Sequence, residues 1–309
     1  MTDNKPTQEL IEQWMAMTSA PIHYTKVCDS QFDKMYWPHL RVIFERTVKK
    51  GITERTGSKD GMYRYCANLN QPVLLKRGGV MRDSGLVLPF DLRQWVFLGY
   101  DTVSVVAGSK SSGKTGFLLR TVALNILREG HKVELLTNLE GGIDMLSARF
   151  SALDIEIPDP EPFTIRPVYE NYHDYIKEPN TIYVIDYIDV PDGEKMYLIG
   201  HLIKKIAQKL QGLDSVAVVG LQKPPSRDLA VGGSNTLDAA MLYVALDSGK
   251  LKIVDAKVSA QKGLHPKNMQ FTFQYEDEGT RFTNIEPYYG EEIPYVPKKG
   301  TPWINKGAI

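Results

Sequence analysis

The stretch that most constrains this chain is GSKSSGKT, residues 108–115, which fits the pattern G-x-x-x-x-G-K-[ST]. The apolar run TVSVVA precedes it, and GFLLRTVALNILREG follows it. These flanks predict a strand, a glycine-rich loop and a helix that closes near Gly130, which is the context that the pattern requires. The backbone N–H groups of such a loop and the N-terminus of its helix form a fixed positive field for phosphates. The sequence therefore predicts a nucleotide triphosphate site in an α/β domain.

The loop assigns the expected nucleotide contacts. Lys114 is expected to reach the phosphates and the Thr115 hydroxyl to hold Mg²⁺, while Gly108 and Gly113 allow the backbone to curl tightly. Together the predicted contacts are Gly108, Ser109, Lys110, Ser111, Ser112, Gly113, Lys114, Thr115 and Gly116.

Three more polar residues stand near the ends of predicted strands. Asp186 ends TIYVID and is predicted to complete the Mg²⁺ site with Thr115. Glu140 ends KVELLTNLE and is predicted to orient the attacking water, the alternative being an acid in the first turn of the next helix. Gln222 ends a strand in VAVVGLQKPPSRD and is predicted to sense the γ-phosphate, the alternative being an ordinary connecting loop. The predicted catalytic residues are therefore Lys114, Glu140 and Gln222.

Apolar runs and helical segments alternate through the rest of this region. The runs are TVSVVA, KVELLTN, TIYVID, VAVVGL, MLYVAL and KLKIVDAK. Such alternation predicts a largely parallel sheet covered by helices. We place this α/β domain at residues 85–285, after a polar, Gly/Pro-punctuated linker at 69–84. Residues 286–309 contain four prolines and no periodicity, so we expect an extended C-terminal tail.

Residues 1–68 have a different character. TQELIEQWMAMT (7–18) and PHLRVIFERTVKKG (38–51) have helical spacing, and ITERTGSKDGMYRYC reads as two strands around a turn. Between residues 34 and 77 we count ten Lys/Arg and three Asp/Glu, a surplus of seven positive charges on a chain of zero net charge. A basic amphipathic helix followed by a basic hairpin is the plan of a winged helix, whose helix enters the major groove of DNA.

The predicted DNA contacts lie in this basic segment and in the polar stretch after Gln222. They are Arg41, Arg46, Lys49, Lys50, Arg55, Lys59, Arg64, Lys223 and Arg227. Two alternatives stay open for the first domain: a winged helix that docks a protein, and charges that are merely solvated.

Membrane and secretory signals are missing from the sequence pattern. No window approaches 18 uninterrupted apolar residues, and the N-terminus lacks the basic-then-apolar plan of a signal peptide. The two cysteines have no metal-binding spacing. We therefore expect a cytoplasmic protein without a membrane partner.

The phosphate loop, Glu140, Asp186 and Gln222, in this order, resemble the RecA-like ATPase core, especially its DnaB-type helicase, RadA and KaiC relatives. The resemblance spans roughly residues 86–274. LTNLEGGIDMLSARF matches a strand that ends in the catalytic glutamate and a helix with a later arginine, here Glu140 and Arg149. YVIDYIDV gives Asp186 the Walker B role, and VAVVGLQK gives Gln222 the sensor role. The resemblance implies a RecA-like fold, ATP and Mg²⁺ as cofactors, and homo-oligomers that form through the ATPase domain.

Two features depart from the family pattern. In hexameric relatives a K-x-R pair reaches the neighbouring subunit's nucleotide; in DAKVSAQKG, Lys257 matches the lysine, but Ser259 stands at the arginine. Lys262 could substitute, although its point charge lacks the forked geometry of arginine. The N-terminal domain resembles a winged helix rather than a helicase collar, an arrangement associated with phage or mobile-element ATPases.

The resemblance implies a DNA-binding, Mg²⁺-dependent ATPase that remodels DNA or moves along it. The alternative is a slow ATP-dependent switch that controls DNA binding or the loading of a replication or recombination partner, and the missing arginine favours it. A small-molecule kinase would use the same loop, but the sequence has no evident acceptor-binding signature.

Overall fold

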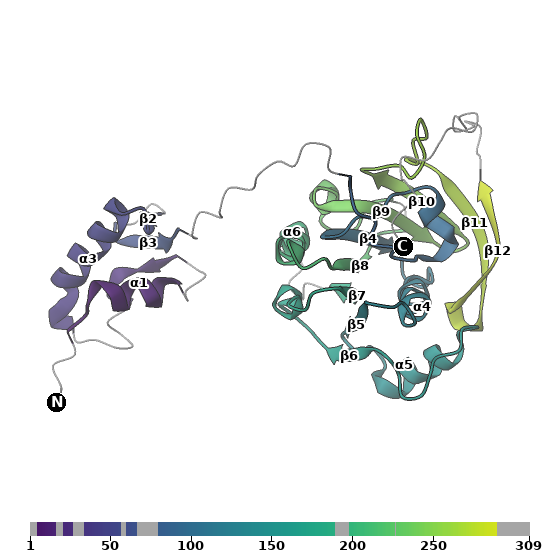
Figure 1. Cartoon of the computed structure of the whole chain (residues 1–309), viewed down its shortest axis with the longest axis horizontal. Coiled ribbons are helices and arrows are strands. Elements are labelled where there is room, and N and C mark those ends of the chain that lie inside the picture. The colour runs from purple at the N-terminus through teal and green to yellow at the C-terminus, as the bar shows by residue number, and fades with distance from the viewer. Residues whose placement is uncertain are drawn as a thin grey trace. The chain divides into compact units, whose positions relative to one another are not determined.

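The computed structural model describes residues 5–16, 21–26, 34–56, 60–66, 80–188, 198–225 and 227–288. The chain divides into two compact units, Met1–Gly79 and Val80–Ile309 (Figure 1). The second unit thus begins at Val80, whereas the sequence analysis placed its start at residue 85. Ser84 is buried there, and its hydroxyl donates a hydrogen bond to the carbonyl of Leu98 at 2.7 Å. Residues 69–79 of the expected linker lie outside the described residues.

The first unit combines two amphipathic helices with a small antiparallel sheet. Its elements are α1 (Gln8–Ala16), β1 (Ile22–His23), η1 (Lys34–Tyr36), α3 (Trp37–Lys49), β2 (Thr53–Arg55) and β3 (Met62–Tyr65). The strand order is β1-β3-β2. The apolar faces of both helices pack on the sheet, and the buried residues are Ile11, Met15, Leu40, Ile43, Phe44 and Tyr63. The two helices and the hairpin expected from the sequence are therefore present, each slightly shorter than its sequence pattern.

The second unit is built around one large sheet. In chain order its elements are η2 (Pro89–Gln94), β4 (Thr102–Gly108), α4 (Lys114–Asn125), β5 (Lys132–Thr137), α5 (Gly142–Ser151), β6 (Thr164–Pro167), η3 (Tyr172–Tyr175), β7 (Thr181–Ile188), α6 (Leu198–Leu210), β8 (Val216–Gln222), η5 (Gly233–Thr236), β9 (Ala240–Asp247), β10 (Lys250–Ala256), β11 (Gln270–Glu276), η6 (Asp277–Gly279) and β12 (Arg281–Tyr288). All six strands expected from the apolar runs are present.

The sheet is mixed, with a parallel majority. Its nine strands follow the order β12-β11-β10-β9-β4-β8-β7-β5-β6. Every neighbouring pair from β9 to β6 is parallel, whereas β9 to β12 form an antiparallel meander. The predicted α/β class with a mostly parallel central sheet is confirmed. Strand β12 continues to Tyr288, so it takes in the first residues of the expected tail.

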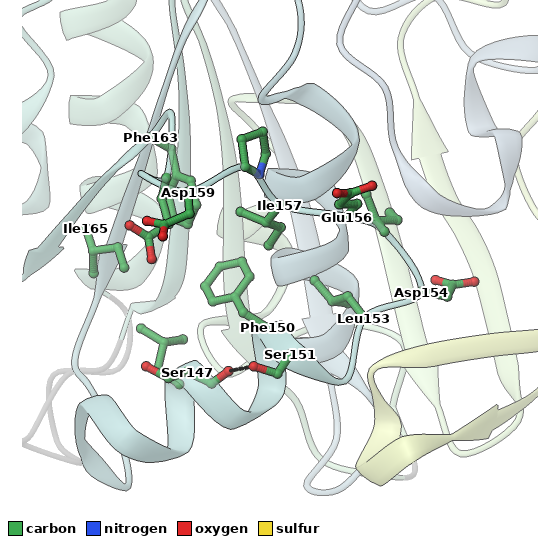
Figure 2. Close-up of a pocket in the computed structure, with 14 residues that line it drawn as sticks. Ser147, Phe150, Ser151, Leu153, Asp154, Glu156, Ile157, Asp159, Phe163 and Ile165 are labelled. Carbon is green, nitrogen blue, oxygen red and sulfur yellow. Dashed lines mark hydrogen bonds between the residues drawn. The ribbon is translucent and has the colours of Figure 1, made fainter.

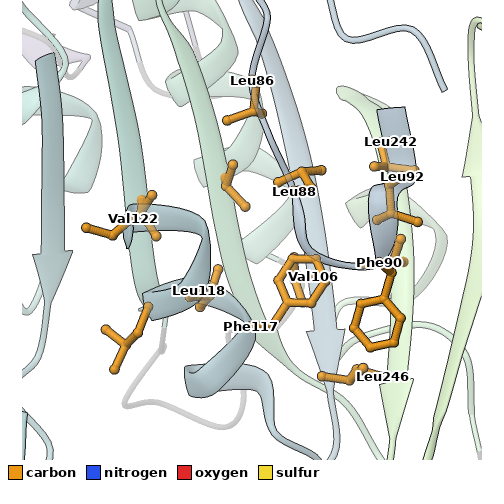
Figure 3. Close-up of a cluster of buried hydrophobic side chains, with 14 of the residues drawn as sticks. Leu86, Leu88, Phe90, Leu92, Val106, Phe117, Leu118, Val122, Leu242 and Leu246 are labelled. Carbon is orange, nitrogen blue, oxygen red and sulfur yellow. The ribbon is translucent and has the colours of Figure 1, made fainter. Parts of the chain in front are cut away.

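Helices cover both faces of this sheet, and each face has its own apolar core. The α4 side carries one cluster, where Phe90 of η2, Phe117 of α4 and Val106 of β4 meet (Figure 3). The α6 side carries the other, which includes Val105 of β4 and Ile203 of α6. Successive residues of β4 thus serve opposite cores, as the two-residue period of a strand requires. This double burial explains why the strand reads as a continuous apolar run rather than an alternating one.

None of the described helices is long and apolar enough to cross a bilayer. Cys66 is half-buried and forms no disulfide, and Cys28 lies outside the described residues.

Candidate nucleotide-binding site

The phosphate loop joins the end of β4 to the start of α4, as the sequence predicted. Ser111 and Gly113 have positive φ angles of 59° and 84°, so the backbone enters the left-handed region twice within three residues. A Cβ at Gly108 would lie 2.7 Å from both the Cβ of Lys114 and the Oγ of Ser112. Glycine is therefore required at 108 because the loop folds back on its own start. This curl turns the loop around the N-terminus of α4, where unpaired N–H groups favour an anion.

Lys114, Thr115 and Asp186 come together beside the loop. The Thr115 hydroxyl donates to Asp186 Oδ1 at 3.4 Å, and the Lys114 Nζ lies 4.0 Å from the same oxygen. The Lys114 Nζ also lies 3.7 Å from the centroid of the Tyr187 ring. Burial raises the pKa of Asp186, and the Lys114 charge and the Thr115 hydroxyl act in the opposite direction. A hydroxyl beside a buried carboxylate offers the oxygen ligands that Mg²⁺ prefers.

The order of the strands explains this meeting. Strand β8 lies between β4 and β7, and because all three are parallel their C-terminal ends share one edge of the sheet. Gln222, the last residue of β8, pairs in register with Gly108 and is half-buried. The predicted sensor residue is thus adjacent to the first residue of the phosphate loop.

Glu140 lies in the turn between β5 and α5, with its side chain exposed. Its backbone N–H donates to the Asn138 side-chain oxygen at 3.2 Å, which fixes the turn. The negative charge of Glu140 raises the pKa of Asp186, and the positive charge of Arg149 on α5 lowers it. Both predicted residues are therefore close enough to Asp186 to act on it electrostatically. The catalytic role of Glu140 stays a prediction, and Arg149 was matched only to the helix arginine of the family.

The β11–β12 hairpin packs on the outer side of the phosphate loop, and the sequence analysis did not foresee it. A Cβ at Gly116 would lie 1.8 Å from the carbonyl oxygen of Gly279, in the turn of the hairpin. The Tyr275 hydroxyl donates to the carbonyl of Ser111 at 3.2 Å. Gly116 is thus needed for the close approach of the hairpin. The glycine in DEGTRF, between two strand-like runs, was the available signal.

Lys223 does not lie where the sequence placed it. We predicted a DNA contact, but its side chain is 0% exposed, and its Nζ donates to Asp247 Oδ1 at 2.6 Å and to the Arg227 carbonyl at 2.9 Å. The ammonium is therefore unavailable to DNA phosphates, and Lys223 leaves the set of DNA contacts. Arg227 is exposed. The sequence analysis missed Asp247, which ends β9.

Ion pairs engage part of the basic surface of the first unit. Arg41 pairs with Asp60 at 3.2 Å, and Lys50 with Glu12 at 3.7 Å. Arg55 and Arg64 likewise pair with Glu45 and Glu54. Arg46 and Lys49 on α3 are exposed, and within the described residues no ion pair involves them. Lys59 lies outside the described residues.

The segment after β10 carries Lys257 and Ser259. It lies at the end of the strands opposite the phosphate loop. The backbone N–H of Lys257 donates to the Met241 carbonyl at 2.9 Å, near the start of β9. Ser259 pairs with Val96. Because β9 runs parallel to β4, its start lies away from the phosphate loop. Neither residue is placed to act on a nucleotide bound to the same chain.

A separate cavity of about 460 Å³ lies between α5 and the segment that leads into β6. Phe150, Ile157 and Phe163 are among its apolar lining residues, and Glu156 and Asp159 are among its acidic ones (Figure 2). None of the predicted site residues lines this cavity.

Comparisons with known proteins found a likeness among solved structures alone. No model of a known protein family matches the chain, and no curated protein matches it. Among solved structures, the chain is similar to the crystal structure of the RadB recombinase, with a TM-score of 0.44 and 16% sequence identity. The match covers 60% of this chain and 92% of that chain. A likeness at this TM-score says nothing about activity or partners. Any function must therefore be argued from the geometry of the site.

Proposed function

We propose that the second unit is a RecA-like ATPase that binds ATP and Mg²⁺ at the end of β4. The observation that carries the proposal is the meeting of Lys114, Thr115 and Asp186 beside a phosphate loop with the expected strand and helix on either side. The strand order supports it, because β8 brings Gln222 to the same edge. The phosphate loop, Asp186 and Gln222 come from three separate stretches of the sequence, and they lie at the same edge of the sheet.

Each group has a task that its position fits. The loop N–H groups and Lys114 would bind the phosphates, while Thr115 and Asp186 would hold Mg²⁺. The bound Mg²⁺ supplies charge neutralisation on the phosphate oxygens. Glu140, exposed in the turn after β5, would orient the water that attacks the γ-phosphate. Gln222 would bond the γ-phosphate and respond to its loss.

Turnover tests the assignment. We expect Lys114→Ala to abolish ATP binding, because it removes the cation from the phosphate site. Glu140→Gln should keep ATP binding and lose turnover, because an amide cannot accept the proton of the water. Binding is measured by titration calorimetry and turnover by phosphate release. Normal phosphate release by Glu140→Gln would show that Glu140 is not the catalytic base.

We further propose that the first unit and Arg227 bind DNA, so that the ATPase remodels DNA or moves along it as a homo-oligomer. Exposed Arg46 and Lys49 on an amphipathic helix support this role. The second candidate is a slow switch that controls DNA binding or the loading of a replication or recombination partner. Ser259 favours the switch, because a neutral side chain stands where the arginine of ring-forming relatives would be.

One pair of measurements distinguishes the motor from the switch. The ATPase rate is measured with and without single- and double-stranded DNA, and the size of the protein is measured in ATP and Mg²⁺. Strong stimulation by DNA together with an ATP-dependent ring or filament supports the motor. Slow turnover that ignores DNA, in a monomer or dimer, supports the switch and excludes the motor.

Charge reversal tests the DNA surface. We expect Arg46→Glu with Lys49→Glu to weaken DNA binding and to flatten its dependence on salt, since each lost phosphate contact lowers the slope of log K against log salt by about 0.9. Lys204→Glu in α6, whose lysine pairs with Asp238, is the matched control and should leave binding unchanged. Unchanged affinity in the double variant would reassign this helix to protein docking. Binding is measured by fluorescence anisotropy over a salt series.

A further inference from the structure

Lys223 is a buried cation to which the proposed mechanism gives no task. It follows Gln222 at the end of β8, and its side chain is 0% exposed. A buried ammonium is costly unless partners compensate for the lost water. Its partners belong to three segments: the phosphate loop, the end of β9, and the loop that follows β8.

The contacts form a chain that starts in the phosphate loop. The Ser109 hydroxyl donates to Asp247 Oδ1 at 3.0 Å, and the Lys223 Nζ donates to the same oxygen at 2.6 Å. The Lys223 Nζ also donates to the Arg227 carbonyl at 2.9 Å. In addition, the Lys223 backbone N–H donates to the Gly108 carbonyl at 3.0 Å. Asp247 Oδ1 therefore connects the phosphate loop to Lys223, which in turn is hydrogen-bonded to the Arg227 carbonyl.

We call residues 223–225 and 227–231 the post-β8 loop. It has other anchors, which do not touch the phosphate loop. The Lys252 Nζ on β10 pairs with Asp228 at 2.7 Å, and the Ala230 N–H donates to the Tyr243 hydroxyl at 2.8 Å. The post-β8 loop is thus fixed to β9 and β10 independently of Lys223. Among the side-chain contacts of the described residues, only the one through Lys223 continues to the phosphate loop.

We propose that Lys223 and Asp247 are a positioning pair that transmits nucleotide occupancy from the phosphate loop to the post-β8 loop and its exposed Arg227. The proposal rests on nucleotide binding at the phosphate loop, as proposed above. Ser109 and Lys223 compete for one oxygen of Asp247. When a bound phosphate draws the Ser109 hydroxyl toward itself, Lys223 becomes the sole donor of the two to that oxygen. The hydrogen bond from Lys223 to the Arg227 carbonyl changes as a result. Lys223 acts through its neighbours and does not touch the nucleotide.

Cleavage at Arg227 reports directly on the post-β8 loop. Trypsin cleaves after arginine, and a segment becomes accessible to it where the local structure loosens. The full chain is treated with trypsin, with and without Mg²⁺ and a non-hydrolysable ATP analogue, and cleavage at Arg227 is followed by mass spectrometry. Binding of the analogue is measured on the same samples. In the wild type we expect the analogue to change the cleavage rate about fivefold or more, the lower end of ordinary couplings between sites.

Two variants and one control isolate the pair. In Lys223→Met, which keeps the length of the side chain but removes its charge and donors, the analogue should still bind, but cleavage should no longer respond to it. Asp247→Asn, at a side chain that is 37% exposed, should give the same result and covers the case in which Lys223→Met does not fold. In the control Lys252→Met the post-β8 loop loses its ion pair with Asp228. Cleavage should then be faster in both states, with the response to the analogue intact.

The outcomes separate this proposal from the proposed function. A wild-type response in both Lys223→Met and Asp247→Asn would overturn the positioning pair. A wild type that binds the analogue without any change at Arg227 would also overturn it, while the ATPase proposal would stand. A wild type that does not bind the analogue would overturn both. A response lost in Lys252→Met as well would show that any loosening of the post-β8 loop suffices, and this result too would overturn the specific role of Lys223.

Discussion

Asp186 is a buried carboxyl group whose pKa is shifted in opposite directions by its burial and by its neighbours. Burial raises its pKa, and Lys114 and Thr115 act against that rise. A raised pKa means that the folded state holds the proton more tightly than the unfolded state. This carboxyl therefore makes the protein less stable as the pH rises from the ordinary aspartate value of about 3.9 through the raised one. A cation bound beside the ionised carboxylate would reverse that penalty, because it favours the charged form.

Stabilisation by Mg²⁺ and ATP should accordingly depend on pH at this residue. As the pH falls toward the pKa of Asp186, the proton competes with Mg²⁺, so the rise in melting temperature caused by Mg²⁺-ATP should shrink. The shrinkage should begin above the pH range of an ordinary aspartate. The measurement compares melting curves in Mg²⁺-ATP and in ATP with chelator, over a descending pH series. Asp186→Asn should lack the Mg²⁺-dependent part at every pH, and a full Mg²⁺ effect in this variant would exclude Asp186 as a metal ligand.

Among the elements, the β11–β12 hairpin has the clearest consequence for the site, because its turn lies against the start of α4. Gly116 in an open helix would be replaced by alanine with a gain of about 1 kcal/mol, since alanine favours helices. Here the added Cβ would meet the Gly279 carbonyl at 1.8 Å. We therefore expect Gly116→Ala to destabilise the protein by about 1–3 kcal/mol and to weaken ATP binding, because the hairpin or the phosphate loop must shift.

Gly212→Ala is the matched control for this substitution. Gly212 has a φ of +79° and nothing within 4 Å of an added Cβ, so alanine there costs stability through the backbone alone. Both variants should lose stability in chemical denaturation, but only Gly116→Ala should lose affinity for ATP. Equal ATP affinity in the two variants would show that the hairpin does not shape the phosphate loop.

How far the sequence predicted this architecture also depends on the element. The six strands were predictable because each contains apolar residues in a strand-like run, which is largely buried on both faces in every case except β10. The end of β8 at Gln222 followed from these runs, whereas β7 continues past Asp186 to Ile188. Strands β11 and β12 were not, because QFTFQYE buries only Phe271 and Phe273, and RFTNIEPY is exposed from Asn284 onward, so neither forms an apolar run. The prediction that Lys223 contacts DNA was wrong for another reason. Its partner Asp247 is 24 residues away in sequence, and only the placement of β8 and β9 on either side of β4 brings the two together.

At the scale of the whole chain, each of the two units has apolar core packing of its own. The first unit has its own cluster around Phe44 and Tyr63, whereas the second has clusters on both faces of its large sheet. The site residues Lys114 and Asp186 belong entirely to the second unit. Ligand binding stabilises only the state that binds the ligand, and chains with several units commonly unfold in more than one step. Bound nucleotide should therefore stabilise the second unit against unfolding and leave the stability of the first unit unchanged.

We expect calorimetry of the full chain to show two unfolding transitions, of which Mg²⁺-ATP raises only one. Phe44→Ala, at a fully buried aromatic side chain of the first unit, should destabilise the other by about 3–5 kcal/mol, because it removes apolar burial and leaves a cavity. Val184→Ala in β7, buried in the core of the second unit, is the matched variant and should lower the transition that ATP raises. A single transition that moves with all three changes would show that the two units unfold as one. Nucleotide binding would then stabilise the N-terminal helices as well, and the basic surface of α3 would be thermodynamically coupled to the phosphate loop.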